Sequence, residues 1–170
     1  MKTYKPTTPG RRGMSTVTYR GKLTESKPHK ALTRGGKRGV GRNAKGRITT
    51  RHKGAGHKRR FRDIDFSYNK RDIPAKVLSV EYDPNRSGFI ALVAYKDGEK
   101  RYILAPKEAK VGDVFTVSEK AKVSAGNRLP LSKMPIGTFV YNIEIKPNGG
   151  AKIARSAGNY AEVIAQDAGY

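Results

Sequence analysis

The sequence predicts an all-β protein built from small antiparallel barrels and preceded by a long, basic, non-globular extension. Three observations support this fold class. Short β-rich runs recur between turn signals from Pro74 onward. No stretch of the sequence shows a sustained helical period with capping residues. The positive charge is concentrated in the N-terminal third, where apolar side chains are few.

Residues 1–62 carry nearly all of the excess positive charge. They contain 20 Lys and Arg against one acid, Glu25, a net charge of +19, whereas residues 63–170 contain 16 Lys and Arg against 13 acids, a net charge of +3. Such a segment buries too little apolar surface to offset the entropy of ordering its backbone. We expect residues 1–60 to be disordered alone and ordered on a polyanionic partner, rather than to form a solubilising tail without specific contacts.

Four or five strands are predicted between this extension and residue 125. The clearest runs are residues 74–82, 89–96, 100–105 and 114–117. In the first run, Leu78, Val80 and Tyr82 lie on one face at period two. The dipeptide Asp97-Gly98 between two of the runs predicts a hairpin. This number of strands is enough for a five-stranded barrel.

About three strands are predicted after a boundary near residue 125. The runs are residues 138–146, 152–155 and 160–165. In the first of them, one face is expected to carry Phe139, Tyr141, Ile143 and Ile145. Three strands are few for a closed barrel, and an open barrel leaves unpaired edges and apolar side chains exposed. We therefore expect that either the chain is cut short, or residues 126–170 pack on the first barrel or on a partner.

Composition excludes several classes of protein. The absence of Cys excludes a disulfide scaffold, a thiolate zinc site, an iron–sulfur cluster and a cysteine nucleophile. The longest apolar run, Phe89 to Tyr95, is too short to cross a bilayer. The charged N-terminus is followed by no apolar stretch, so we expect no secretory signal.

Two glycine motifs in the basic third match nucleotide-binding loops only in spacing. Residues 39–44 fit G-x-G-x-x-A, but they follow no strand and open no apolar helix. Residues 41–48 have the spacing of a phosphate loop, but Arg47 and Ile48 stand where Lys and Ser or Thr are needed. We expect neither a dinucleotide site nor a P-loop.

The titratable residues also predict no enzyme. His29, His52 and His57 are the only imidazoles, and no further ligands converge on them as a metal site requires. Asp63 and Asp65 would share one face of a strand, as a general acid/base pair could. Because Arg59, Arg60 and Arg62 are nearby in sequence, ion pairs with neighbouring cations are the better interpretation. We expect no catalytic residue, no metal site and no cofactor.

Residues 47–62 combine residue types that suit a nucleic acid. Arg binds phosphate oxygens bidentately and stacks on bases, and Gly lets the backbone approach phosphates closely. His52, His57 and Phe61 add planar faces for stacking on unpaired bases. A membrane-surface patch is the alternative, but the many glycines argue against the amphipathic helix that such a patch usually uses. RNA is favoured over DNA because a flexible arm can thread a folded RNA, and no helix-turn-helix or finger pattern is present.

Motifs along essentially the whole chain carry a family resemblance. The most extensive are Gly46-Arg47-Ile48-Thr49, Gly56-His57-Lys58-Arg59-Arg60, Ile64-Asp65-Phe66, Glu81-Tyr82-Asp83-Pro84-Asn85-Arg86-Ser87, Asp97-Gly98-Glu99-Lys100-Arg101-Tyr102-Ile103-Leu104-Ala105-Pro106 and Ala154-Arg155-Ser156-Ala157-Gly158. In this order they resemble the large ribosomal subunit protein L-two family.

The resemblance implies three segments. These are a basic Gly-rich RNA-binding extension over residues 1–60, an OB-fold RNA-binding domain over residues 61–125 and an incomplete SH3-like barrel over residues 126–170. It also implies a non-enzymatic structural constituent of the large ribosomal subunit. In that role the protein binds large-subunit ribosomal RNA near the peptidyl-transferase region and supports subunit assembly and association.

The implied partners are the ribosomal RNA, neighbouring ribosomal proteins and the small subunit, with no membrane, no small-molecule substrate and Mg²⁺ only as part of the RNA. The implied location is the cytoplasmic ribosome, with an organellar ribosome left open. Two other functions remain as alternatives. One is an auxiliary peptidyl-transferase component acting through His52 or His57, and the other is DNA binding outside the ribosome.

The expected RNA-binding residues lie mainly in the basic third. They are Arg11, Arg12, Arg38, Arg42, Arg47, Arg51, His52, His57, Lys58, Arg59, Arg60 and Arg62, together with Arg86 and Arg155. The last two stand in turns that match family positions in contact with RNA, and the alternative for each is a loose surface ion pair.

Two departures from the family pattern limit what the resemblance implies. Tyr141 stands where the family commonly has His, so any role of that His does not carry over. The family also continues past the position of Tyr170 into a Gly- and His-rich tail linked to the peptidyl-transferase region. Functions of that tail are not assigned to this chain.

Overall fold

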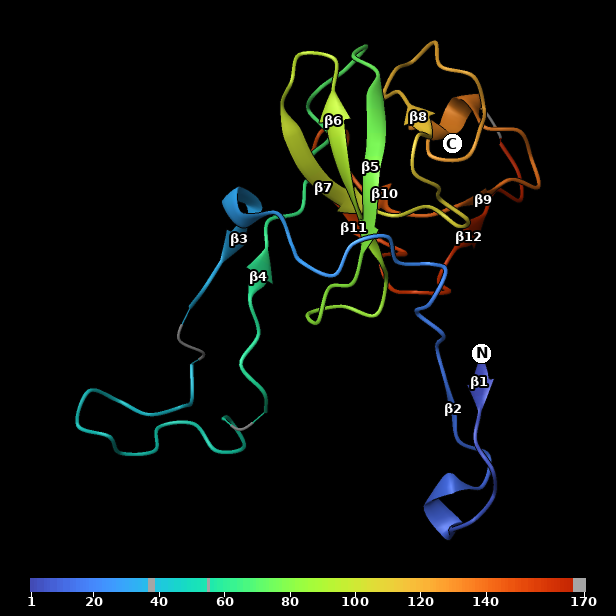
Figure 1. The fold of residues 1–170 in the computed structure, drawn as a ribbon. Coiled ribbons are helices and arrows are strands. Elements are labelled where there is room, and N and C mark those ends of the chain that lie inside the picture. The colour runs from blue at the N-terminus through green and yellow to red at the C-terminus, as the bar shows by residue number, and fades with distance from the viewer. Residues whose placement is uncertain (37–38, 55, 167–170) are drawn as a thin grey trace.

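The computed structural model describes residues 1–36, 39–54 and 56–166 (Figure 1). These residues form short strands and single turns of 3-10 helix, with no α-helix among them, so the predicted all-β class is confirmed. In chain order the elements are β1 (Lys2–Thr3), η1 (Pro9–Arg11), β2 (Ser15–Thr16), η2 (Lys30–Leu32), β3 (Thr33–Arg34), β4 (Phe61–Arg62), β5 (Ala75–Glu81), β6 (Ile90–Tyr95), β7 (Lys100–Leu104), β8 (Val114–Phe115), η3 (Leu131–Lys133), β9 (Phe139–Val140), β10 (Ile143–Glu144), β11 (Ala151–Ile153) and β12 (Ala161–Glu162).

A curled antiparallel sheet of four strands, in the order β7-β6-β5-β8, forms the centre of the molecule (Figure 1). The predicted hairpin between β6 and β7 is confirmed. Gly98 has a φ of +88° and its N–H donates to the carbonyl of Tyr95 at 2.9 Å. Positive φ is readily available to glycine, which explains why Asp-Gly is an effective turn signal here.

Strand β6 is buried on both faces and separates two apolar clusters. Ala91, Val93 and Tyr95 belong to the larger cluster, together with side chains of β5 and β8. Ile90 and Leu92 belong to the smaller cluster, together with Ile64 and Tyr102. Burying side chains of this size stabilises the fold by about 1.5–3 kcal/mol each. These two clusters hold the curled sheet together.

A β-bulge in β5 decides which of its side chains reach the core. The register pairs Val77 with Val93 and Ser79 with Leu92, so Leu78 is the extra residue. Val77 and Val80 are both buried, whereas Leu78 and Tyr82 are exposed. The prediction that Leu78, Val80 and Tyr82 share one face is therefore wrong, because the bulge takes Leu78 out of alternation with Val80 and Tyr82 lies beyond the end of β5.

A segment of the basic third is attached to β5 at Val80, two residues after this bulge. The N–H of Thr24 donates to the carbonyl of Val80 at 3.0 Å, and the N–H of Val80 donates to Thr24 Oγ1 at 2.9 Å. Leu23 packs on the larger apolar cluster. The ring of Tyr19 meets that of Tyr82 edge-on at 5.3 Å between centroids. Residues 19–24 thus cover part of the sheet, which their charge and composition do not indicate.

The same basic third makes two excursions away from the sheet (Figure 1). One is a lobe that contains β1, η1 and β2. The other is the stretch between β3 and β4, residues 35–60, which we call the basic loop. Its base is closed because Thr33 pairs with Arg62 and Arg34 with Phe61. The domain boundaries at residues 60 and 125 stay predictions.

The predicted strand over residues 138–146 is wrong, because the chain breaks it into β9 and β10. Asn142 lies between them with a φ of +56°, a region that Asn tolerates better than most residues. Its side chain is buried, and its Nδ2 donates to the hydroxyl of Tyr68 at 3.0 Å. Phe139 and Ile145 are 63% and 65% exposed, so they do not line a common buried face.

The C-terminal part, which contains β9 to β12, is packed less densely than the central sheet. Its strands form two separate antiparallel pairs, β9 with β12 and β10 with β11. Apolar side chains such as Leu129, Val140 and Val163 line an open cavity of about 1570 Å³ between them. This arrangement agrees with the incomplete second barrel that was expected. Within the described ranges, no helix has the length and hydropathy that a membrane span requires.

Candidate nucleic-acid interface

The basic loop is organised by a small turn structure over residues 41–50. The carbonyl of Gly41 accepts the N–H groups of Thr49 and Thr50, at 2.8 and 3.2 Å. Asn43 Oδ1 accepts the N–H of Arg47 at 2.9 Å, and Arg42 Nη1 donates to the carbonyl of Gly46 at 2.8 Å. Local backbone and side-chain bonds therefore shape this loop without an apolar core.

Most of the expected RNA-binding residues are exposed on the two excursions. Arg11 and Arg12 lie on the lobe of β1 and β2, and the basic loop carries Arg42, Arg47, Arg51, His52, His57, Lys58, Arg59 and Arg60. Arg38 lies outside the described residues. In the described part of the chain, none of these exposed side chains forms an ion pair. Their charges are available to a polyanion.

Arg62 is placed differently from its neighbours in sequence. It lies in β4, is 8% exposed, and its Nη1 donates to the carbonyl of Arg60 at 2.9 Å. Its Nε is buried without a hydrogen-bond partner in the structure. The side chain stabilises the base of the loop from inside, and a direct contact of Arg62 with RNA stays a prediction.

The turn after β5 holds Arg86 through a buried carboxylate. Asp83 is fully buried, and its Oδ2 accepts a hydrogen bond from Arg86 Nε at 2.6 Å. Its Oδ1 accepts two bonds from Asn85, one from the backbone and one from the side chain. The same Asn85 side chain donates to the carbonyl of Arg60 at 2.8 Å. This turn therefore also contacts the end of the basic loop.

Arg86 and Arg155 lie over the same aromatic ring. The guanidinium carbon of Arg155 is 3.6 Å from the centroid of Phe66, and that of Arg86 is 5.5 Å away. A guanidinium within about 6 Å of a ring centroid is attracted by the negative face of the π system. We call these three residues, Phe66, Arg86 and Arg155, the arginine platform.

Backbone contacts bring the two turns of the platform together. The N–H of Ala157 donates to Ser87 Oγ at 3.1 Å, and the N–H of Ala151 donates to the carbonyl of Phe66 at 2.8 Å. Gly88 lies close to the backbone of Arg155 and Ala157, where an added Cβ would make ordinary contacts. The platform is thus assembled from segments that are far apart in the sequence.

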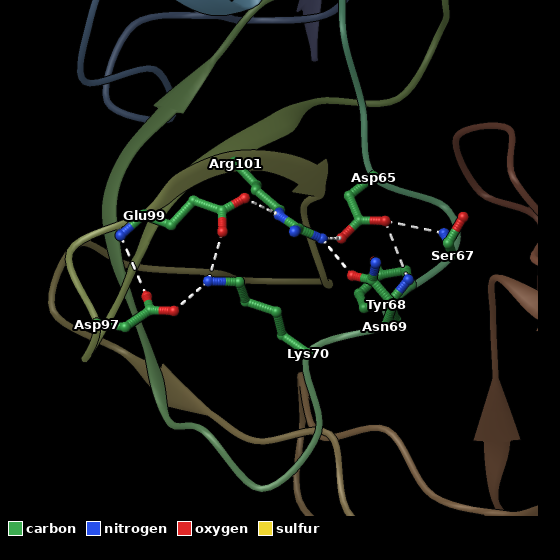
Figure 2. Close-up of polar contacts among 8 residues, drawn as sticks. All are labelled: Asp65, Ser67, Tyr68, Asn69, Lys70, Asp97, Glu99 and Arg101. Atoms are coloured by element: carbon green, nitrogen blue, oxygen red, sulfur yellow. Dashed lines mark hydrogen bonds and ion pairs between the residues drawn. The ribbon is translucent and has the colours of Figure 1, made fainter.

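By contrast, several charged side chains of the β6–β7 hairpin and of the segment before β5 pair with one another in a network (Figure 2). Arg101 Nη1 donates to Asp65 Oδ2 at 2.7 Å, and Arg101 Nε donates to Glu99 Oε1 at 2.5 Å. Lys70 pairs with both Asp97 and Glu99. The prediction that Asp63 and Asp65 pair with cations nearby in sequence is wrong, because Asp63 pairs with Arg34 and Asp65 with Arg101.

Protonation in this network follows the ion pairs. The hydrogen bond from Lys70 holds the pKa of Asp97 below its ordinary value, and the bond from Arg101 does the same for Glu99. The bond to Asp97 in turn raises the pKa of Lys70. All of these groups remain charged at neutral pH, and their charges are paired. Lys70 and Arg101 are therefore less available to a polyanion than the cations of the basic loop.

A second cation–π contact marks the junction between the sheet and the C-terminal part. The guanidinium of Arg128 lies 4.5 Å from the ring centroid of Tyr68, and Arg128 Nη2 donates to Glu144 Oε1 at 2.7 Å. Tyr141, the residue that departs from the family pattern, is half-buried nearby. Burial raises the pKa of its hydroxyl to about 12, so Tyr141 is neutral at pH 7. Its position is that of a packing residue.

The three imidazoles occupy separate places. The backbone N–H of His29 donates to the hydroxyl of Tyr102 at 2.7 Å, whereas His52 and His57 are exposed on the basic loop. Among the described residues, no three His, Cys, Asp or Glu side chains are arranged to hold a metal ion.

Sequence reasoning missed two residues of this interface. In the sequence, Phe66 stands out only as part of a motif, and Asp83 only as a turn residue. The role of each depends on contacts with partners distant in sequence or with a buried turn, and no local pattern signals them. The one sequence signal for the contact is that Phe66 and the two turn arginines, Arg86 and Arg155, stand in separate motifs of one family.

Comparisons with known proteins agree on one family. The family model described as "Ribosomal Proteins L2, RNA binding N-terminal domain" matches residues 29–117, and "Ribosomal Proteins L2, C-terminal domain" matches residues 124–170. The large ribosomal subunit protein uL2 of Roseobacter denitrificans is 53% identical over 170 residues. The uL2 proteins of Ruegeria sp. (strain TM1040) and Ruegeria pomeroyi are each 52% identical over the same length. The whole chain aligns in each case, and it spans 60% of the length of these relatives.

Proposed function

Because the chain belongs to the ribosomal protein L2 family, we propose that it is a structural component of the large ribosomal subunit that binds large-subunit ribosomal RNA. Two features of the molecule support this function. The exposed cations of the basic loop and of the β1–β2 lobe are free of ion pairs among the described residues, and the arginine platform adds two guanidinium groups beside the end of the loop.

The observation that carries the proposal is that some cations are paired with carboxylates while, in the part of the chain that the structure describes, those of the two excursions are not. Lys70 and Arg101, on the sheet side, are paired with Asp65, Asp97 and Glu99, whereas the exposed cations of the excursions have no such pairs among the described residues. Free cations attract phosphates and release condensed counterions, and paired cations do so less. The sheet then supplies shape and register, while the excursions supply electrostatic affinity.

The finer parts of the proposal follow from the family. Binding takes place near the peptidyl-transferase region, supports subunit assembly and association, and brings the protein beside neighbouring ribosomal proteins and the small subunit in a cytoplasmic ribosome. The role is non-enzymatic and uses no cofactor, with Mg²⁺ present only as part of the RNA. Contact through the arm and the two turns needs no reacting group, only charge, planar faces and hydrogen-bond donors.

Filter binding to a transcript of the large-subunit ribosomal RNA of Roseobacter denitrificans tests this function. If the protein contacts roughly 6–10 phosphates, affinity falls about 10³–10⁵-fold between ~50 and ~200 mM salt. Removing two charges from the basic loop, with Arg47→Gln and Arg51→Gln, should reduce the slope of log affinity against log salt by about two.

Lys100→Gln with Lys107→Gln is the matched control, because it removes the same charge from exposed positions on the sheet side. We expect this pair to leave the slope close to that of the unaltered protein. If the two double substitutions reduced the salt slope equally, only net charge would matter. That result would contradict the proposed difference between the excursions and the sheet. Equal competition by random duplex DNA would favour DNA binding instead.

A further inference from the structure

We propose that Phe66 is a positioning residue of the RNA-binding surface, whose ring holds Arg86 and Arg155 together against one short stretch of RNA backbone. The inference rests on the proposed function and deepens it, because it names the phosphodiester backbone as the group that this part of the surface recognises. Phe66 itself need not touch the RNA, and it acts through the two arginines.

The ring of Phe66 attracts both guanidinium groups of the platform, which repel each other. Among the described residues, the one carboxylate paired with either of them, Asp83, bonds only the Nε of Arg86. The face of an aromatic ring carries negative charge density, so one ring attracts both cations without consuming their hydrogen-bond donors. The distances of 3.6 and 5.5 Å from the ring centroid place both groups within the range of this attraction.

The donors that remain are those suited to phosphate. Among the described residues, the guanidinium of Arg155 makes no hydrogen bond, and Arg86 uses only its Nε, so the terminal nitrogens of both are unused. Arg binds phosphate oxygens through such planar pairs of N–H groups. Side chains that are already held in place lose less rotamer entropy when the RNA binds.

The platform also joins the two parts of the chain. Arg86 follows β5 of the central sheet, and Arg155 follows β11 of the C-terminal part. The contacts of Ala157 with Ser87 and of Ala151 with Phe66 keep these segments adjacent. An RNA backbone that contacts both arginines therefore binds the docked arrangement of the two parts and stabilises it.

Filter binding of Phe66→Leu and Phe66→Tyr to the same ribosomal RNA transcript tests the inference. Leu keeps an apolar side chain but removes the π face, whereas Tyr keeps the ring. We expect Phe66→Leu to weaken binding roughly three- to tenfold and to reduce the salt slope by about one, and Phe66→Tyr to bind like the unaltered protein. Equal losses for the two variants, or no loss for Phe66→Leu, would overturn the inference.

A double-mutant cycle with Arg155→Ala separates positioning from general packing. If Phe66 acts through Arg155, Phe66→Leu should cost little further affinity in the Arg155→Ala background. If Phe66→Leu reduced RNA affinity as much in the Arg155→Ala background as in the unaltered protein, the inference would be wrong. Because Phe66 also packs on the smaller apolar cluster, Phe66→Leu could lower stability. Replacing Phe66 by pentafluorophenylalanine keeps the shape and reverses the charge of the ring face, so unchanged affinity there would also overturn the inference.

The result for the unaltered protein keeps the two proposals apart. Salt-independent binding by the unaltered chain would contradict the RNA-binding function itself. Salt-dependent binding that no change at Phe66 affects would leave that function standing and would reject only the role of the ring.

Discussion

At the scale of single residues, Gly41 controls the shape of the basic loop. It has a φ of +67°, and an added Cβ would lie 2.3 Å from the carbonyl oxygen of Thr50. Positive φ costs other residues about 1–2 kcal/mol, and the overlap with a backbone oxygen adds to that cost. We predict that Gly41→Ala opens the turn over residues 41–50 and weakens binding to ribosomal RNA about three- to tenfold, as measured by filter binding.

The thermal midpoint of Gly41→Ala should stay unchanged, because the turn contributes nothing to the two apolar clusters. Gly39→Ala is the matched control, since nothing lies within 4 Å of its added Cβ. Full RNA affinity in Gly41→Ala would show that the turn is not needed in the bound state.

At the scale of elements, Thr24 bonds the backbone of β5 at Val80, beyond the residues that β8 pairs. Its hydroxyl accepts the N–H of Val80 at 2.9 Å, and this contact is partly buried. We predict that Thr24→Val lowers the free energy of unfolding by about 1–3 kcal/mol, because the N–H of Val80 loses its partner. Urea unfolding followed by circular dichroism measures this loss.

Thr18→Val provides the comparison, since Thr18 is exposed and its hydroxyl makes no hydrogen bond to another described residue. The control should unfold at the same urea concentration as the unaltered protein. Matching midpoints for Thr24→Val and Thr18→Val would mean that the attachment of residues 19–24 to the sheet contributes little to stability.

At the scale of the whole molecule, the basic loop is separable from the sheet because β3 and β4 close its base. Replacing residues 36–59 by Asn-Gly should leave a tight hairpin and retain the carbonyl of Arg60 that Asn85 binds. The replacement removes nine Lys and Arg. We predict unchanged thermal stability, a large loss of RNA affinity, and a salt slope that is shallower by about four to six.

Affinity and salt slope are measured together in this experiment, because a loss of affinity alone could reflect altered shape. A loop-deleted protein with the original slope would place the phosphate contacts elsewhere, on the β1–β2 lobe or the arginine platform. A protein that no longer folds would show that the loop contributes to the sheet, contrary to the exposure of its side chains.

Several features of the fold follow from local sequence. The hairpin at Asp97-Gly98 was predictable because a two-residue turn needs a residue that tolerates positive φ, and the dipeptide supplies it. The excess charge of residues 1–62 follows from counting, and it predicts which part of the chain is suited to a polyanion. The motifs containing Arg86 and Arg155 pointed to RNA through the family they resemble.

Other features were not predictable, because they depend on partners distant in sequence. The period-two pattern of residues 74–82 assigned the wrong face, since nothing local marks Leu78 as the bulged residue. The pattern of residues 138–146 hid the break at Asn142, whose buried side-chain Nδ2 donates to the hydroxyl of Tyr68. Asp65 is paired by Arg101 rather than by the arginines beside it in the sequence.

The sequence by itself determined the all-β class, the division of charge between the basic third and the rest, and the residue types available to RNA. Each of these depends on composition or on near neighbours in the chain. Only the tertiary structure decided which cations are paired and which are free, and it alone placed the ring of Phe66 within cation–π distance of both Arg86 and Arg155. The reason is that ion pairs and cation–π contacts act over a few ångströms in space, whatever the separation of their residues along the chain.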